Sequence, residues 1–262
     1  MVLPDTQTYL EQCPEVFDSQ VDWLVANRKK IDAVFQVGDL TQDNSPVEWA
    51  YMQKAFHRIS QAGIPYSVVW GNHDIGSKPG KFSDVHNTAM ANKYFPLSDY
   101  KQKSYWGGSA DGKTLDNYYI NLRSGDTDWL VLNLEFGPSD EALQWADSIV
   151  GIHPDKLVIL NTHAYLYCDS TLHDGERLVA SSRIWHRQRV RAHSERWRWN
   201  LEEIAFQASQ CDSCLLWACL EKRSWHAGLY RERRGIKCIR CWQTISVVWK
   251  AVDWEVRATY AL

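Results

Sequence analysis

Three short apolar runs near the start of the chain alternate with two amphipathic segments, and this alternation constrains the fold most. The apolar runs are Val2-Leu3, residues 33–37 and residues 66–70. Between them, residues 14–30 repeat apolar side chains at helical spacing, and Ser45-Pro46-Val47-Glu48 has the capping-box pattern that opens a helix ending near Ala62. Alternation of this kind predicts a βαβ sheet with mainly parallel strands.

The next part of the chain continues in the same α/β class. Residues 104–122 place turn-forming Gly residues between aromatic runs and predict antiparallel hairpin strands. Residues 128–136 and 156–160 predict two further strands, and Ser139 caps a helix that runs to about residue 150. No apolar run has the length of a membrane span, and no signal-peptide pattern opens the chain. We expect a soluble protein, cytoplasmic as the chain is written, with export expected if a leader precedes it.

The composition of the chain changes near Glu176. Residues 1–176 carry 13 Lys and Arg against 24 Asp and Glu, whereas residues 177–262 carry 16 against 8. The second part holds 13 of the 16 Arg, 5 of the 7 Cys and 8 of the 14 Trp, with no Pro and two Gly. Loops between packed elements normally need Gly and Pro, so this composition does not fit a continued α/β domain. We expect one domain over residues 1–176 and an anomalous tail over residues 177–262.

Polar residues of one chemical kind follow four of the predicted strands. Asp5, Asp39 and Asn72-His73-Asp74 follow the first three apolar runs, and His163 follows residues 156–160. In α/β sheets the carboxyl ends of the strands form the ligand crevice, so we expect these side chains to converge. Carboxylates, an amide oxygen and imidazoles suit Mn, Fe or Zn. A shared carboxylate can hold two such ions roughly 3.5–4 Å apart, the arrangement that clamps a phosphoryl group.

These motifs resemble, in order and in spacing, those of the calcineurin-like metallophosphoesterase superfamily over about residues 1–170. The family pattern runs Asp-x-His, Gly-Asp-x-x-Asp, Gly-Asn-His-Asp/Glu, a lone His, and then Gly-His-x-His. The matching segments here are Asp5-Thr6-Gln7, Gly38-Asp39-Leu40-Thr41-Gln42, Gly71-Asn72-His73-Asp74 and Asn161-Thr162-His163. The form Pro4-Asp5-Thr6-Gln7 is similar to that of a bacterial branch whose members are often large exported proteins. The fold implied is the family's four-layer α/β/β/α sandwich, here incomplete at the C-terminus.

The resemblance implies a metal-dependent phosphoesterase that hydrolyses a phosphomonoester or phosphodiester, on a small molecule or a polymer, by a metal-activated hydroxide. The cofactors implied are one or two divalent metal ions, Mn, Fe, Zn or Mg. The implied metal ligands are Asp5, Gln7, Asp39, Asn72 and His163. Asp39 would bridge the two ions. His73 would face the phosphoryl group as the catalytic acid, and Asp74 would orient its ring.

Three departures from the family pattern bear on activity. Gln7 stands where the family usually has His, and Gln42 stands where the second motif often ends in Asp. An amide oxygen is a poorer transition-metal ligand than an imidazole, so the first metal site is expected to be weak or empty. The third departure is larger, because no Gly-His dipeptide occurs after His163. The sequence therefore leaves a second interpretation open, a non-catalytic relic of the fold with too few ligands for two ions.

A shifted reading frame after about Glu176 would explain both the tail composition and the missing motif. Shifted by one base, the codons of Trp217-Ala218 can read Gly-His, at the end of a segment that can read as a strand. Without the later strands of the fold, the strands near Asp128 and Lys156 are expected to have exposed edges, and the product is expected to have low solubility.

A third class of function rests on the tail alone. Cys211-x-x-Cys214 and Cys238-x-x-Cys241 are the spacing of a zinc ribbon, and the Arg-Trp stretch over residues 183–199 could bind nucleic acid. Elsewhere in the chain, His57 and Glu48 are expected on the solvated face of their helix, and His86 on the surface.

Overall fold

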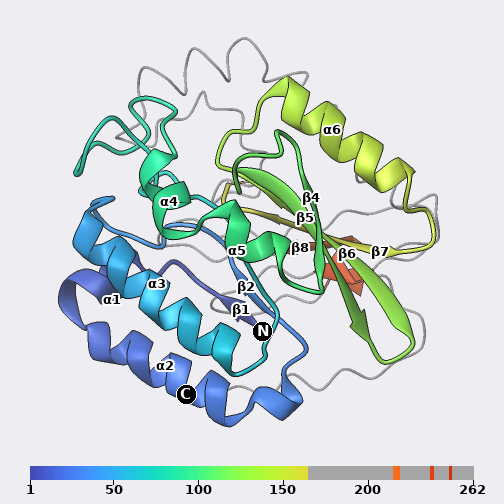
Figure 1. Ribbon diagram of the computed structural model, residues 1–262, viewed down its shortest axis with the longest axis horizontal. Helices are drawn as coiled ribbons and strands as arrows, with labels where there is room; N and C mark the ends of the chain where they lie inside the picture. The colour runs from blue at the N-terminus through green and yellow to red at the C-terminus, as the bar shows by residue number, and fades with distance from the viewer. Residues whose placement is uncertain (165–214, 219–236, 239–247, 250–262) are drawn as a thin grey trace.

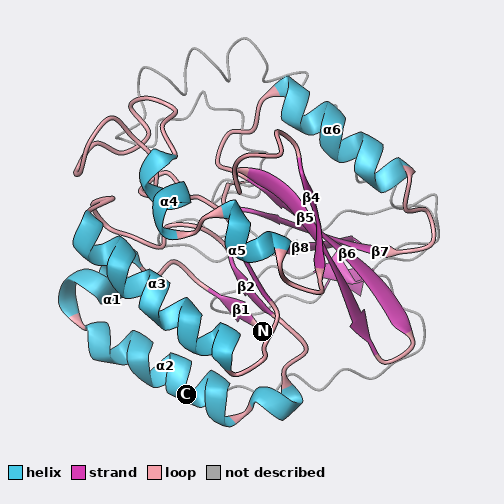
Figure 2. Cartoon of the chain, viewed as in Figure 1, coloured by secondary structure: helices cyan, strands magenta, loops and turns pink. Residues whose placement is uncertain are grey.

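The computed structural model describes residues 1–164 and three short segments, residues 215–218, 237–238 and 248–249 (Figure 1). It is a mixed α/β structure with two main sheets (Figure 2). The first sheet holds strands β1 (Val2–Leu3), β2 (Val34–Gln36) and β3 (Tyr66–Val68), all parallel and in that order. The prediction of a parallel βαβ arrangement at the start of the chain is confirmed.

The second sheet has the order β4-β5-β6-β7-β8. Its strands are β4 (Trp106–Ser109), β5 (Asn117–Ser124), β6 (Thr127–Leu134), β7 (Leu157–Thr162) and β8 (Leu215–Ala218). Strands β4, β5 and β6 are antiparallel neighbours, as the hairpin prediction requires, and β6, β7 and β8 are parallel. Strands β9 (Lys237–Cys238) and β10 (Val248–Trp249) form a separate antiparallel pair.

The strand order corrects the prediction of exposed edges. Strand β6 lies between β5 and β7, and β7 lies between β6 and β8, so neither presents an open edge. Strand β8 supplies the second neighbour of β7, with Ala218 opposite Asn161. The prediction overlooked this partner because β8 belongs to the tail, whose composition suggested no continuation of the sheet.

The described residues form six α-helices and one 3₁₀ turn, and two of the helices begin after a Ser, Ser45 or Ser139, whose side chain accepts a hydrogen bond from the helix backbone. These elements are α1 (Gln7–Gln12), α2 (Pro14–Ala26), the 3₁₀ turn η1 (Arg28–Lys30), α3 (Pro46–Gln61), α4 (Ala89–Tyr94), α5 (Leu97–Lys101) and α6 (Asp140–Gly151). The predicted capping box of α3 is present, because Ser45 accepts a hydrogen bond from the Glu48 backbone while Glu48 accepts one from the Ser45 backbone. Among the described helices, none is long and apolar enough to span a membrane.

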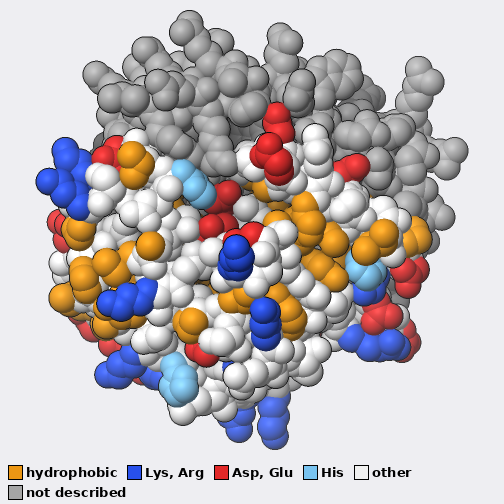
Figure 3. Space-filling model, turned by 45° about the horizontal axis from the view of Figure 1, so that its top comes forward, with side chains coloured by type: hydrophobic (Ala, Val, Ile, Leu, Met, Phe, Trp, Pro, Cys, Tyr) orange, Lys and Arg blue, Asp and Glu red, His pale blue; other side chains and the backbone are white. Residues whose placement is uncertain are grey.

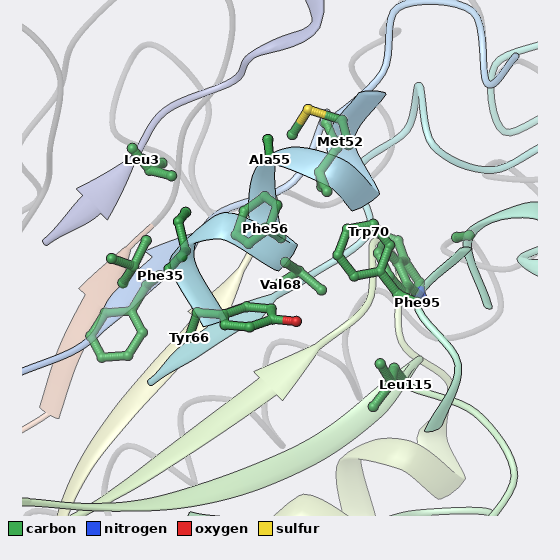
Figure 4. Close-up of a cluster of buried hydrophobic side chains, with 14 of the residues drawn as sticks. Leu3, Phe35, Met52, Ala55, Phe56, Tyr66, Val68, Trp70, Phe95 and Leu115 are labelled. Atoms are coloured by element: carbon green, nitrogen blue, oxygen red, sulfur yellow. The ribbon is translucent and has the colours of Figure 1, made fainter. Parts of the chain in front are cut away.

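Two apolar clusters join the helices to the sheets. In the first, α2 and α3 pack on the first sheet through side chains such as Phe56, Tyr66 and Trp70 (Figure 4), and the cluster continues to Tyr118 of the second sheet. The Tyr118 hydroxyl also lies 2.8 Å from both the backbone nitrogen and the carbonyl oxygen of Val68, which ties the two sheets together. The second cluster lies between α6 and strands β6 and β7. Helices α2 and α3 thus cover one side of the pair of sheets and α6 the other (Figure 1).

Candidate metal centre

The polar residues at the strand ends meet at one place in the structure. Asp5, Asp39 and Asn72 come shortly after β1, β2 and β3, which run parallel and so end at the same edge of the first sheet. His163 comes directly after β7 in the second sheet. A buried hydrogen bond of 3.2 Å from Asn161 Nδ2 to the carbonyl oxygen of Gln36 holds the end of β7 beside the end of β2.

His163 lies at the centre of this group. Its Nδ1 is 2.9 Å from the carbonyl oxygen of Val37. A carbonyl can only accept, so Nδ1 carries a proton and Nε2 is the nitrogen that can bind a second proton or a metal ion. That Nε2 lies 3.1 Å from Asn72 Oδ1 and 3.5 Å from Asp39 Oδ1, and all three side chains are buried. The lone pairs of these three atoms repel one another unless a positive charge lies between them. That charge is either a proton on Nε2 or a metal ion.

The donor set fits a divalent metal ion. Neighbouring ligands around a transition metal with bonds of about 2.0–2.2 Å lie roughly 3.0–3.4 Å apart. The contacts from His163 to Asn72 and Asp39 are close to that spacing. The hydrogen bond from Nδ1 to Val37 is the outer contact that fixes the tautomer and the ring orientation of a ligating histidine.

The pKa of His163 also indicates a site that binds positive charge. Burial lowers the pKa of His163, but the carboxylates of Asp39 and Asp5 and the hydrogen bond to Val37 outweigh it, so the pKa lies above its usual value. The Asp5 carboxylate is therefore close enough to act on the ring. A site that raises the pKa of a buried imidazole is one that attracts positive charge.

Two glycines allow the motifs to approach each other this closely. A Cβ atom on Gly38 would lie 2.5 Å from Nδ1 of His163, and a Cβ atom on Gly71 would lie 2.3 Å from Oδ1 of Asp39. Both distances are far below a real carbon contact. Asp39 itself has a positive φ of 50°, a conformation that Asp adopts more readily than most residues. The glycines of the second and third motifs are thus required by close packing against His163 and Asp39.

The first motif docks on the second through the backbone. The amide nitrogens of Thr6 and Gln7 lie 3.1 and 3.0 Å from the carbonyl oxygen of Asp39, and both donate to it. Gln7 is buried as the first residue of α1. This contact places Asp5 and Gln7 next to Asp39, as a shared metal site would require.

His73 is held by a partner that differs from the predicted one. Its Nδ1 lies 2.7 Å from the carbonyl oxygen of Gln42, and its ring stacks on Phe82 with the ring centres 4.0 Å apart. The predicted orientation of the ring by Asp74 stays a prediction, and the Gln42 carbonyl is a partner that the sequence did not suggest. This carbonyl belongs to the loop after β2, which reaches the ring because the loops of the second and third motifs lie against each other.

Asp74 holds these two loops together. Its carboxylate accepts hydrogen bonds from the backbone nitrogens of Leu40 (3.0 Å), Thr41 (2.9 Å) and Gly71 (2.9 Å), and from the Thr41 hydroxyl (2.9 Å). Complete burial and the charge of Asp39 raise the pKa of Asp74 to about 7, against the lowering effect of these hydrogen bonds. Asp74 thus links the loops of the second and third motifs.

Glu48 is a further residue whose role differs from the prediction. Its carboxylate accepts hydrogen bonds from the backbone nitrogens of Gln42 (2.8 Å) and Ser45 (3.0 Å), so this half-buried side chain binds the loop before the helix as well as facing solvent. Through Gln42 it fixes the carbonyl that holds His73. The capping-box pattern revealed the helix start but not this second function of the same side chain.

The structure also gathers three residues that sequence reasoning did not connect. His86, Asp116 and Glu135 place one donor atom each within 4.8 Å of one another. His86 was expected on the surface, and its side chain is 30% exposed, but Nε2 lies 2.5 Å from Oε2 of Glu135. Glu135 directly follows β6, and this position at a strand end was the signal that could have drawn attention to it. Figure 3 shows a gathering of acidic side chains beside a histidine on one face of the molecule.

Comparison with known proteins adds three findings. The family model described as calcineurin-like phosphoesterase matches residues 1–194. Among curated proteins, the chain is 32% identical over 167 residues to "Uncharacterized protein YvnB" of Bacillus subtilis (strain 168). That match covers 63% of this chain but 12% of the length of the Bacillus protein. Among solved structures, a purple acid phosphatase, PPD1 from yellow lupin seeds, is similar with a TM-score of 0.36 and 17% identity, over 56% of this chain and 25% of the lupin chain.

Proposed function

Because the chain belongs to the calcineurin-like phosphoesterase family, we propose that it is a metal-dependent hydrolase of a phosphomonoester or phosphodiester. The reaction would take place where the ends of β1, β2, β3 and β7 meet. The observation that carries this proposal is the convergence of His163 Nε2, Asn72 Oδ1 and Asp39 Oδ1, three metal-ligating atoms from three separate motifs.

The proposed metal ligands divide into a stronger and a weaker set. Asp39, Asn72 and His163 form the stronger set, with an imidazole whose second nitrogen is already anchored. Asp5 and Gln7, with Asp39 shared, form the weaker set, because an amide oxygen replaces the expected imidazole. A bound divalent cation would supply positive charge for the phosphoryl oxygens and a hydroxide at neutral pH.

His73 is proposed as the proton donor to the leaving oxygen. The Gln42 carbonyl accepts a hydrogen bond from Nδ1–H, so the proton exchanged with substrate would be carried by Nε2. Stacking on Phe82 keeps the ring from rotating away. Asp74 contributes by holding the loops that carry both His73 and its carbonyl partner.

For the fold, we propose that residues 1–176 form the phosphoesterase domain, with the two sheets and their outer helices as the four-layer α/β/β/α sandwich. Residues 177–262 would be a tail with an anomalous composition that contributes strand β8 to the second sheet. The zinc-ribbon and nucleic-acid predictions rest on Cys211, Cys214, Cys241 and residues 183–199, which lie outside the described residues.

The proposal is tested by hydrolysis of bis(p-nitrophenyl) phosphate and p-nitrophenyl phosphate with added Mn²⁺. We expect activity that is abolished by chelation and by Asp39→Asn or His163→Ala. The control is His57→Gln, which changes an exposed histidine on α3 outside the site. A folded protein that binds Mn²⁺ at this site but hydrolyses neither ester would instead support the relic interpretation. A folded protein that neither hydrolyses nor binds Mn²⁺ would refute both the enzyme and the metal centre.

A further inference from the structure

A second group of metal-ligating side chains lies outside the site described above. His86 comes from the loop after the third motif, Asp116 precedes β5, and Glu135 follows β6. Their donor atoms all lie within 4.8 Å of one another, and the closest pair is His86 Nε2 and Glu135 Oε2 at 2.5 Å. Three segments distant in sequence thus deliver one imidazole and two carboxylates to one point.

Both carboxylates are held in place by neutral donors. Asp116 accepts hydrogen bonds of 2.8–2.9 Å from three side chains, those of Trp70, Thr88 and Asn92. Glu135 accepts one of 3.0 Å from Asn117 Nδ2 through its other oxygen, Oε1. Outer donors of this kind orient metal-ligating carboxylates in known sites. The two carboxylates are therefore fixed before any cation arrives.

Among the described residues, the basic side chain that pairs with these carboxylates is His86. Glu135 is buried, and burial together with the charge of Glu135 raises the pKa of Asp116. Among the described residues, neither carboxylate forms a salt bridge with Lys or Arg. Two carboxylates this close are stable when a cation lies between them or when one of them takes up a proton, and the cation is either a protonated His86 or a metal ion.

We propose that His86, Asp116 and Glu135 hold a divalent cation of the Mn²⁺ or Zn²⁺ class, at a site separate from the centre around His163. A ligand set of one imidazole and two carboxylates suits these ions. The His86 side chain is 30% exposed, which gives an ion a path from solvent and leaves room for water in the remaining coordination positions.

The proposed cation would brace the family's third motif. Trp70 directly precedes Gly71, and its ring nitrogen donates to Asp116 at 2.9 Å. The Trp70 carbonyl oxygen accepts a hydrogen bond from Phe136, the neighbour of Glu135. The Phe136 ring in turn packs edge-on against His163, with ring centres 5.9 Å apart. The second cation therefore has a structural role, because it joins the three segments that surround the first centre.

Counting bound Mn²⁺ in the full-length protein tests this proposal. Free Mn²⁺ is measured by its electron paramagnetic resonance signal, and Mn²⁺ is chosen because thiolates, which occur in the tail, select other metals. The variants are His86→Gln and Asp116→Asn for the second site, Asp39→Asn for the first, and the double variant His86→Gln with Asp39→Asn. His57→Gln, on an exposed part of α3, is the matched control.

We expect His86→Gln and Asp116→Asn each to bind one equivalent less than the wild type, and the double variant to lose one more than Asp39→Asn alone. Mn²⁺ should raise the unfolding temperature of Asp39→Asn but not that of the double variant. The proposal is overturned if His86→Gln and Asp116→Asn bind as much Mn²⁺ as the wild type, since a protonated His86 would then neutralise the two carboxylates. It is also overturned if Asp39→Asn abolishes all binding.

Discussion

A Cβ atom on Gly38 would lie 2.5 Å from Nδ1 of His163, so the second motif and the end of β7 fit together because residue 38 has no side chain. The same histidine nitrogen donates to Val37, the residue before Gly38. One contact, between segments 125 residues apart in sequence, therefore fixes both the backbone path at Gly38 and the orientation of the His163 ring.

Gly38→Ala should displace His163 and weaken the metal centre. Gly38 also has a φ of +104°, so the substitution adds backbone strain to the collision. We expect a loss of about 1–3 kcal/mol of unfolding free energy and a fall in activity of roughly 100-fold, measured by urea unfolding and by Mn²⁺-dependent hydrolysis. Gly112→Ala is the control, because Gly112 has a φ of +68° with nothing within 4 Å of the added carbon. Equal effects of both substitutions on activity would contradict the steric argument.

Asp74→Asn should destabilise the fold. The amide keeps one acceptor oxygen and turns an NH₂ group toward buried N–H donors, among them those of Leu40, Thr41 and Gly71. At least one of these donors loses its acceptor, which costs about 1–3 kcal/mol. Urea unfolding of the metal-free protein measures the change. An unfolding free energy equal to that of the wild type would show that Asp74 does not hold the two loops together.

Glu48→Ala should lower kcat with little effect on KM. It removes the acceptor of the Gln42 backbone nitrogen and so loosens the carbonyl that orients His73. We expect a fall in kcat of roughly tenfold, since the proton donor stays present but is less well placed. The loss of the helix cap should also cost about 1 kcal/mol. Val47→Ala, at an 80% exposed position of the same turn, should change neither quantity. A normal kcat in a destabilised Glu48→Ala protein would limit Glu48 to its capping role.

Gln7→His should strengthen the weaker metal site. Gln7 is buried beside Asp39, and an imidazole binds Mn²⁺ or Zn²⁺ better than an amide oxygen does. We expect affinity for the more weakly bound ion to rise by roughly tenfold or more, as determined by competition with a chelator. Gln53→His, on the exposed face of α3, is the control. If metal affinity is unchanged, residue 7 does not point its side chain at the centre.

The coding DNA should reveal a second reading frame across the tail. Strand β8 lies parallel to β7 with Ala218 opposite Asn161, so the chain leaves β8 toward the edge that carries His163. A shift of one base can place Gly-His at residues 217 and 218, at the end of this strand, if the Ala218 codon is the one that reads as His. Sequencing the gene decides the matter. If no other frame encodes Gly-His at these codons, the frameshift explanation of the tail is wrong.

The strands at the apolar runs, their ends and the helix that begins after Ser45 could be predicted because the signals that define them are local in sequence. The capping box at Ser45 and Glu48 and the apolar runs act over a few residues, and the structure has each of these elements within a few residues of its predicted bounds. The backbone preferences of Gly, Pro and β-branched residues are sufficient to predict where a strand ends.

Which groups the site side chains contact depends on the tertiary structure. His163 contacts Asn72 across 91 residues, His73 contacts the Gln42 carbonyl across 31 residues, and His86 contacts Glu135 across 49 residues. These pairs depend on how the loops at the sheet ends pack against one another, and no local pattern carries that information. The sequence by itself therefore determined which residues stand at the ends of the strands. Only the packing of the two sheets and their loops decided which of them touch.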